Sequence, residues 1–224
     1  MDKLNITQNL LKIIALKFKD NKFLNEKKII DQISCLFLNR IIQDINASLL
    51  LSNSGYFGSA RTLLAVTHRN LMMYASLIDA EEERINSFWN EESDTYQDKT
   101  NSFKKDFSEE NSRKLAQKSF EKEAFLKSEF EKSLHGSCFA LRKYYTDRAI
   151  DNGLKTAVVT FEPFKNNLFE EEIKNMSEAY ILDFLGVFFT KYINLDYLKE
   201  ELELYYTIAK ITKSMQSHEK GQIV

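Results

Sequence analysis

The chain has 224 residues, of which 31 are basic, 33 are acidic and 43% are hydrophobic, and its formal net charge is −2. This balance gives no overall attraction to nucleic acid, so an RNA-binding role would need a local basic patch. One proline and six glycines are present. Because proline breaks helices and glycine ends them, the composition predicts long helices and argues against glycine-rich phosphate loops.

The length suits one domain over residues 1–224. The two cysteines, Cys35 and Cys138, lie in apolar helical stretches and are typical of reduced, buried thiols in the cytosol. The N-terminus lacks the pattern of a signal peptide. The longest apolar run, residues 179–189, is too short to span a bilayer. We therefore expect a cytoplasmic protein without a membrane segment.

Apolar residues at three- and four-residue spacing predict three helices in the first 89 residues. The first begins after Asn5 and ends at residues 20–22. The second is capped by Asn25 and extends to a turn that closes at Gly55. The third continues from there past residues 81–83 toward Trp89. The short turn makes the second and third helices antiparallel neighbours.

A charged excursion is expected over residues 90–130. Residues 90–107 are polar and nearly free of aliphatic side chains, which predicts an exposed loop. Acidic residues at 109 and 110 favour the start of a fourth helix. Its charged first half is expected to project or to pair with another chain. Its apolar second half extends from Phe130 to Ala149, with a kink at Gly136, and the helix ends at residues 151–153.

Two further helices complete the predicted fold. Residues 154–161 have strand character, but one short strand cannot form a sheet, so we expect an extended connector that closes at Pro163. A fifth helix over residues 170–192 is apolar almost all round and is therefore predicted to be the most buried. A sixth covers residues 196–215, followed by a flexible tail over residues 217–224. The expected fold class is all-α, an antiparallel bundle of about six helices.

The histidines argue against a metal site. A di-iron bundle needs a glutamate three residues before a histidine, twice, and none of His68, His135 and His218 has one. Gly55 and Gly58 lack the strand and spacing of a phosphate loop, and the first fifty residues do not fit a compact helix-turn-helix. The sequence therefore predicts neither a metal nor a cofactor.

Arg61 and His68 are the candidate catalytic pair. They lie seven residues apart, so two helical turns bring both side chains to one side of the third helix. An arginine can hold a phosphate while a nearby histidine moves a proton. This combination is the chemistry that a metal-independent ribonuclease requires.

The Arg-x6-His spacing resembles the Arg-x4-6-His signature of the HEPN superfamily, and polar Thr62 follows the arginine directly. Residues 49–64 and 134–137 also resemble bacterial helical proteins grouped near it. The superfamily contains helical bundles of bacterial defence and toxin–antitoxin systems, many of them dimeric ribonucleases. The resemblance implies that Arg61 anchors the scissile phosphate of an RNA and that His68 acts as acid or base. His135 would contribute across a dimer interface.

A structural role is the alternative for both residues. Arg61 would then be solvated or salt-bridged, and His68, with Leu64, Leu71 and Met72 at helical spacing, would be partly buried beside a backbone or carboxylate partner. In that case the protein is a non-catalytic interaction module that assembles with itself, as a dimer, or with a partner protein. Both function classes remain open from the sequence.

Asp183 is the remaining unusual residue. Its helical neighbours are Ala179, Tyr180, Gly186 and Val187, so it is predicted to face protein. A buried carboxylate needs a partner, and Arg142 or Arg148 on the preceding helix could provide one. A structural ion pair and a catalytic acid are the two interpretations of this site.

Overall fold

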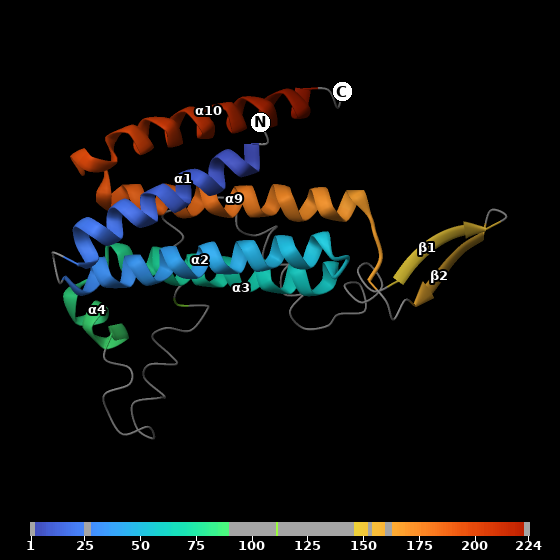
Figure 1. The fold of residues 1–224 in the computed structure, drawn as a ribbon, viewed down its shortest axis with the longest axis horizontal. Coiled ribbons are helices and arrows are strands. Elements are labelled where there is room, and N and C mark those ends of the chain that lie inside the picture. The colour runs from blue at the N-terminus through green and yellow to red at the C-terminus, as the bar shows by residue number, and fades with distance from the viewer. Residues whose placement is uncertain are drawn as a thin grey trace, which may run out of the picture.

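The computed structural model describes residues 3–24, 28–89, 111, 146–151, 154–159 and 163–221. Six α-helices within these residues confirm the all-α class (Figure 1). A π-helical turn over Lys19–Phe23 and a 3-10 turn over Asp196–Leu198 adjoin them. The helices are α1 (Lys3–Phe18), α2 (Ile29–Asn53), α3 (Phe57–Ile78), α4 (Glu82–Trp89), α9 (Asn167–Tyr192) and α10 (Lys199–Gly221).

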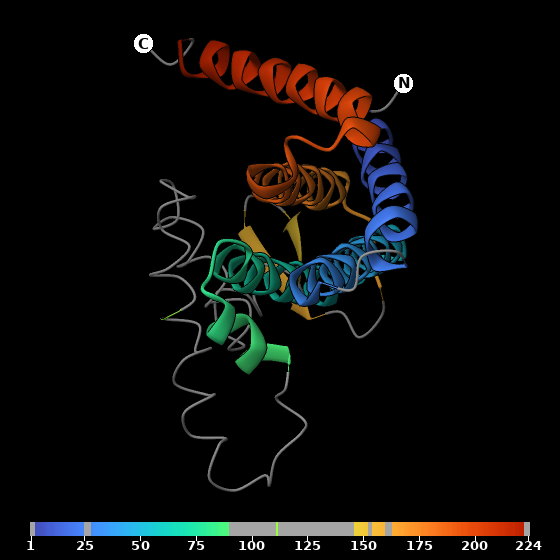
Figure 2. The ribbon, with the colours of Figure 1, turned by 90° about the vertical axis from the view of Figure 1, so that its left-hand side faces the viewer.

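Helix α9 lies at the centre of the bundle. Seen along the bundle in Figure 2, it is flanked by α10 above, by α1 to one side and by α2 and α3 below. Its apolar side chains fill the core, as the composition of residues 181–189 predicts, and Phe184, Leu185 and Phe188 have no exposed surface. The sequence-based prediction that this is the most buried helix therefore agrees with its position.

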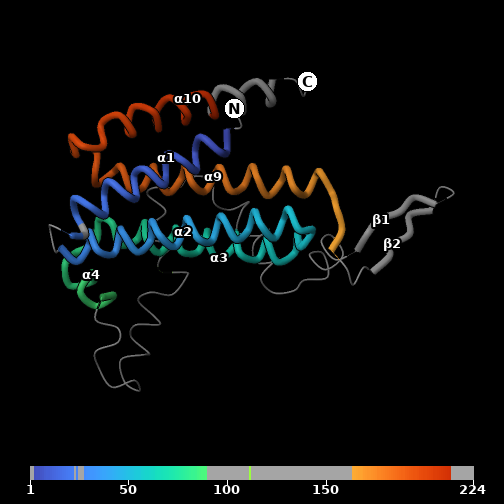
Figure 3. The backbone as a smooth tube through the Cα atoms, in the orientation of Figure 1, coloured from blue at the N-terminus to red at the C-terminus, as the bar shows by residue number. Residues whose placement is uncertain are grey.

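The helices differ in direction. In Figure 3, α1, α3 and α9 run the same way, and α2 and α10 run opposite to them. The contacts between α3 and α9 agree with this direction. Near the start of α3, Arg61 pairs with Glu172, which is 111 residues later. At the end of α3, the Ile78 carbonyl contacts Lys191, which is 113 residues later. Helices α3 and α9 are thus parallel neighbours, so the expected antiparallel packing holds for α2 and α3 but not throughout the bundle.

Helix α3 ends earlier than predicted. It stops at Ile78, and a separate α4 begins at Glu82, whereas the sequence predicted one continuous helix to Trp89. The terminal Ile78 carbonyl accepts a hydrogen bond of 2.7 Å from Nζ of Lys191. This side chain of α9 satisfies a backbone acceptor that the next helical turn would otherwise occupy. Helix α2 likewise begins at Ile29, with Lys28 rather than Asn25 before its first turn.

The turn between α2 and α3 depends on Gly55, as predicted. Its φ of +83° lies in the left-handed region, which side chains with a Cβ adopt at a cost. A Cβ at this position would also lie 2.7 Å from the carbonyl oxygen of Phe164. The turn and the segment before α9 therefore approach each other closely because Gly55 has no side chain.

We expect Gly55→Ala to lower the free energy of unfolding by about 2 kcal/mol, because alanine in the left-handed region is strained and its methyl group meets backbone atoms. Urea denaturation followed by circular dichroism measures this change. Gly58→Ala, which lies within the helix, is the comparison variant. An equal loss in both variants would contradict the special role of Gly55.

Two strands replace part of the predicted fourth helix and connector. β1 (Thr146–Asp151) pairs antiparallel with β2 (Leu154–Val159), and Asp151 lies opposite Leu154. The prediction of a helix through Ala149 was therefore wrong, and the strand-like segment has a partner. Asn-Gly at positions 152 and 153 is the preferred sequence for a two-residue hairpin loop, and this signal was available in the sequence.

The last helix is longer than predicted. Helix α10 continues to Gly221, so the expected tail over residues 217–224 is helical as far as that residue. The loop at 90–107, the helix start at 108–110, the projecting helix and the kink at Gly136 fall outside the residues that the structure describes. Those expectations stay predictions.

Candidate functional site

Arg61 lies in the core between α3 and α9. It is only 3% exposed, and its guanidinium forms an ion pair with the carboxylate of Glu172. The same guanidinium nitrogen lies 3.5 Å from Sδ of Met176, one turn further along α9. Because the carboxylate neutralises the buried cation, Arg61 has the salt-bridged arrangement that the sequence offered as its structural alternative.

His68 follows two turns later on the same side of α3 and is half-buried. Its ring centroid lies 5.7 Å from that of Tyr180, one turn beyond Met176 on α9. Burial raises the pKa of Tyr180 well above its usual value, the charge of Arg61 lowers it, and that of Asp183 raises it. Arg61 and His68 therefore both face the same stretch of α9. The ring of His68 lies near that of Tyr180, and the charge of Arg61 lowers the pKa of the same tyrosine.

Two other predicted site residues cannot be placed. His135 and Arg142 lie outside the described residues. A contribution of His135 across a dimer interface, and a pairing of Arg142 with Asp183, remain predictions.

Asp183 is exposed, which corrects the expectation that it is buried. It lies on a stripe of α9 that also exposes residues 171, 175 and 179. Desolvation by the surrounding atoms still raises its pKa to about 6, although water in contact with the exposed part of the carboxylate favours its charged form. Asp183 also raises the pKa of Tyr205, although burial of that hydroxyl is the larger cause.

A buried polar cluster, which sequence reasoning missed, joins α2, α3 and α9. Tyr192 donates a hydrogen bond of 2.7 Å to Oδ1 of Asp31, which is 3% exposed. The hydroxyl oxygens of Tyr192 and Ser34 lie 3.0 Å apart, and Tyr74 donates to Ser34 across 3.1 Å. We call Asp31, Ser34, Tyr74 and Tyr192 the Asp31 cluster.

The Asp31 cluster has the properties of a structural network. Burial raises the pKa of both tyrosines far above the usual value, so their hydroxyls stay protonated and act as donors. Their rings pack in the core, with Tyr74 4.8 Å from Phe184 and Tyr192 4.7 Å from Phe188 between centroids. Tyr192 of α9 donates to Asp31 and Tyr74 of α3 donates to Ser34, both on α2, so the cluster fixes the relative positions of three helices.

Cys35, beside this cluster on α2, is a free, half-buried thiol. Burial raises its pKa from 9.0 to about 11, and Asp31 adds to the rise while Lys19 opposes it. At pH 8 the thiolate fraction is then about 100-fold lower than for an ordinary cysteine. The thiol is consequently a poor nucleophile in the folded protein.

We expect Cys35 in the variant Cys138→Ser to react with iodoacetamide at pH 8 about 100-fold more slowly in the folded protein than in urea, because only the thiolate reacts. Mass spectrometry of timed samples gives both rates. Raising the pH to 10 should accelerate the folded protein's reaction. Equal rates with and without urea would show that Cys35 is an ordinary exposed thiol.

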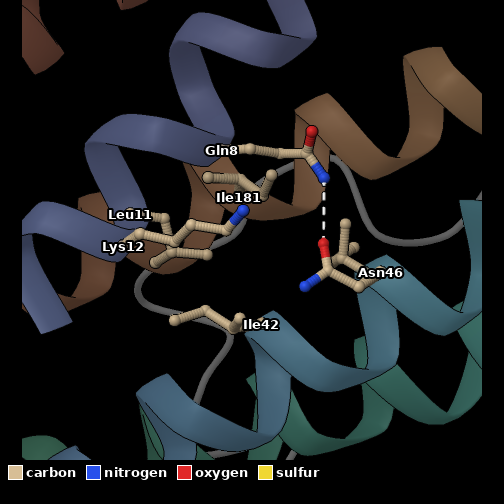
Figure 4. A pocket seen from close by; sticks show the side chains of 7 residues that line it. Gln8, Leu11, Lys12, Ile42, Asn46 and Ile181 are labelled. Atoms are coloured by element: carbon tan, nitrogen blue, oxygen red, sulfur yellow. Dashed lines mark hydrogen bonds between the residues drawn. The ribbon is translucent and has the colours of Figure 1, made fainter.

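A small hollow opens between α1, α2 and α9 (Figure 4). It encloses about 160 Å³ including open solvent, and Gln8 donates to Oδ1 of Asn46 across it at 3.2 Å. Sites for organic ligands are usually about 300–1,000 Å³. The hollow is therefore too small for a cofactor. Its lining residues are Gln8, Leu11, Lys12, Ile42, Ile45, Asn46 and Ile181.

Comparison with protein-family models, with curated proteins and with solved structures gave no match to this chain. Among the described helices, none is both long and apolar enough to cross a membrane. Within the same residues, no three histidine, cysteine or acidic side chains gather where they could hold a metal ion.

Proposed function

We propose that this protein is a non-catalytic helical interaction module that assembles with itself in the cytoplasm. The observation that carries the proposal is the burial of Arg61 in an ion pair with Glu172. A phosphate bound by Arg61 would have to enter the core and displace a carboxylate that already neutralises the guanidinium. This pair connects two helices, and its chemistry suits stability better than phosphate binding.

Exposed apolar side chains support the assembly part of the proposal. Large hydrophobic residues are exposed on α1, α2, α9 and α10, and Leu168 at the start of α9 is 80% exposed. Single exposed apolar residues are ordinary, whereas several on one surface favour an interface. Homodimers with two-fold symmetry are the commonest assemblies of soluble proteins.

Sedimentation equilibrium at several protein concentrations tests this proposal. We expect a species with twice the monomer mass at micromolar concentration, which dissociates on dilution. A monomer mass at every concentration would refute self-assembly.

A ribonuclease related in its chemistry to the HEPN superfamily is the second candidate. It is favoured by one observation, that Arg61 and His68 converge on Tyr180. In this case Arg61 would exchange Glu172 for the scissile phosphate of an RNA, and His68 would move the proton. The exchange requires α3 and α9 to separate locally.

Incubation of the purified protein with single-stranded RNA distinguishes the two candidates. Our proposal predicts no cleavage above that of the double variant Arg61→Lys/His68→Ala. Cleavage by the wild type that both single variants abolish would establish the ribonuclease instead. The variant Arg69→Lys, whose side chain is exposed on the same helix, controls for a nonspecific effect of replacing an arginine with a lysine.

A further inference from the structure

The connection between α9 and α10 lacks the residues that normally end a helix. Residues 193–198, which we call the hinge, contain neither glycine nor proline. Ile193 keeps helical angles, with φ of −62° and ψ of −29°, whereas Leu195 is extended, with φ of −85° and ψ of 105°. Both regions are open to leucine without strain. The local sequence therefore permits two forms of the hinge, a bent one and a continuous helix.

Contacts with the rest of the bundle hold the hinge in its bent form. Leu198 is 1% exposed, and Leu195 packs partly buried against the same core. Leu195 precedes the 3-10 turn, and its apolar side chain offers no oxygen to cap that turn. Acidic residues at 196, 200 and 201 favour a helix start here, an effect confined to the first turn. The bend is therefore specified mainly by what α10 packs against.

Helix α10 lies on a surface that matches it in charge and shape. Oε1 of Glu201 lies 2.7 Å from Nζ of Lys17 on α1. One turn later, the Tyr205 hydroxyl approaches α9 so closely that a Cβ on Gly186 would lie 2.8 Å from its oxygen. The centroid of the Tyr205 ring lies 5.4 Å from that of Phe189. We call Lys17, Gly186 and Phe189 the α10 seat.

The contacts with the α10 seat do not depend on which copy of the chain supplies α10. Each contact joins a residue after the hinge to a residue before it, and the hinge is the only stretch of chain that connects the two sets. A second copy carries the same helix, with the same tyrosine and glutamate at the same spacing. The structure thus shows an occupant that fits the seat, because α10 itself fills it.

We infer that two copies of this chain exchange α10, so that α10 of each copy occupies the α10 seat of the other. The hinge straightens in the exchanged form, and α9 and α10 join into one helix. Because α10 runs opposite to α9 in the bent form (Figure 3), the two joined helices lie antiparallel, as a two-fold axis through the hinges requires. This inference rests on the proposed self-assembly and names the element that performs it.

The hinge also supplies a driving force for the exchange. The last carbonyl groups of one helix and the first N–H groups of the next have no partners within their own helices. In a continuous helix these groups bond to one another, and the gain occurs in both copies. The contacts with the two seats are the same before and after the exchange. The balance between monomer and dimer is therefore set at the hinge.

Proline at position 196 separates the two forms of the hinge. Asp196 is exposed and begins the 3-10 turn, a position that proline accepts. Proline there disfavours helical angles at Leu195, which suits the bent hinge and opposes the straight one. In sedimentation equilibrium, Asp196→Pro should raise the dimer dissociation constant at least about 100-fold above that of the wild type. Asp196→Ala removes the same side chain, allows both forms and should leave the constant unchanged.

Charge exchange at the seat tests the swap by a second route. Lys17→Glu puts two negative charges at this contact, and Glu201→Lys puts two positive charges there. In a swapped dimer with one copy of each variant, both seats regain opposite charges. We expect mixed dimers to outnumber the two homodimers together at least about tenfold when the variants are refolded together from urea. Native mass spectrometry with one variant labelled with nitrogen-15 counts the three species, and random pairing gives equal shares of mixed dimers and homodimers.

The outcomes separate this inference from the proposed function. A wild type that is monomeric at every concentration would overturn both. Equal dimerisation of Asp196→Pro and Asp196→Ala, or random pairing of the two charge variants, would overturn the exchange of α10 and leave self-assembly standing. If Asp196→Pro fails to fold, the charge variants decide the question, because mixed dimers restore the ion pair only when α10 is exchanged.

Discussion

Glu172→Ala is expected to lower the free energy of unfolding by about 3 kcal/mol, because it leaves the guanidinium of Arg61 buried without its carboxylate. Removing one partner of a buried ion pair typically costs about 3–5 kcal/mol. The lower end applies because the Glu172 side chain is 28% exposed, whereas that of Arg61 is 4% exposed. Urea denaturation followed by circular dichroism gives the change in midpoint and slope.

Replacing the other partner, Arg61, should lower the free energy of unfolding much less. Arg61→Met removes the buried charge, fills similar space and leaves Glu172 where water can reach it, so we expect a loss of about 1 kcal/mol. Glu172→Gln, which keeps an acceptor for the guanidinium, should fall between the two. If Arg61→Met destabilises the protein as much as Glu172→Ala does, charge burial is not what makes this pair important.

Tyr192→Phe is expected to lower the free energy of unfolding by about 2–3 kcal/mol. It removes a 2.7 Å hydrogen bond to the carboxylate of Asp31, which is 3% exposed. Hydrogen bonds to charged groups contribute about 1.5–3 kcal/mol, and the abandoned carboxylate adds its own desolvation cost. The ring keeps its contacts with Phe18 and Phe188, so the variant isolates the hydroxyl group.

Tyr74→Phe is the matched control for this prediction. Its hydroxyl donates to neutral Ser34 at 3.1 Å, and its ring is also fully buried, so the loss should be only about 1 kcal/mol. Thermal or urea unfolding of Tyr192→Phe and Tyr74→Phe under the same conditions compares their free energies of unfolding. Equal losses would mean that the charge of Asp31 does not set the strength of the cluster.

The sequence predicted the helices best where the apolar pattern is long. Helix α9 was expected over residues 170–192 and is observed over Asn167–Tyr192. The earlier start comes from the Asn166 side chain, which accepts the backbone N–H groups of Leu168 and Phe169 at 3.0 and 3.2 Å. Asparagine is a favoured residue at this position, so local chemistry could have placed the start correctly.

Boundaries that depend on tertiary contacts were not predictable in this way. The break between α3 and α4 contains neither glycine nor proline, and Lys191, which caps α3, lies 113 residues further along the chain. The hairpin of β1 and β2 is a different case. Asn152-Gly153 is the preferred loop sequence of a two-residue hairpin, whereas the apolar spacing around Ala149 fits a helix, so the sequence carries both patterns.

In the candidate site too, local spacing was predictable from the sequence and distant contact partners were not. Spacing alone placed Arg61 and His68 on one side of α3, and the structure adds that both side chains face α9. It could not identify Glu172, which is 111 residues away. Asp183 was misjudged because its sequence neighbours are apolar, although a four-residue step through positions 175 and 179 would have put it on an exposed stripe.

The late position of the central helix α9 along the chain has a consequence during synthesis. The helix at the centre of the core is built from residues 167–192, long after α1, α2 and α3 have left the ribosome. At about 5–20 residues per second, roughly 6–23 s separate the end of α3 from the end of α9. Throughout this interval the apolar faces that later cover α9 have no helix to cover, and the nascent chain is then most vulnerable to aggregation.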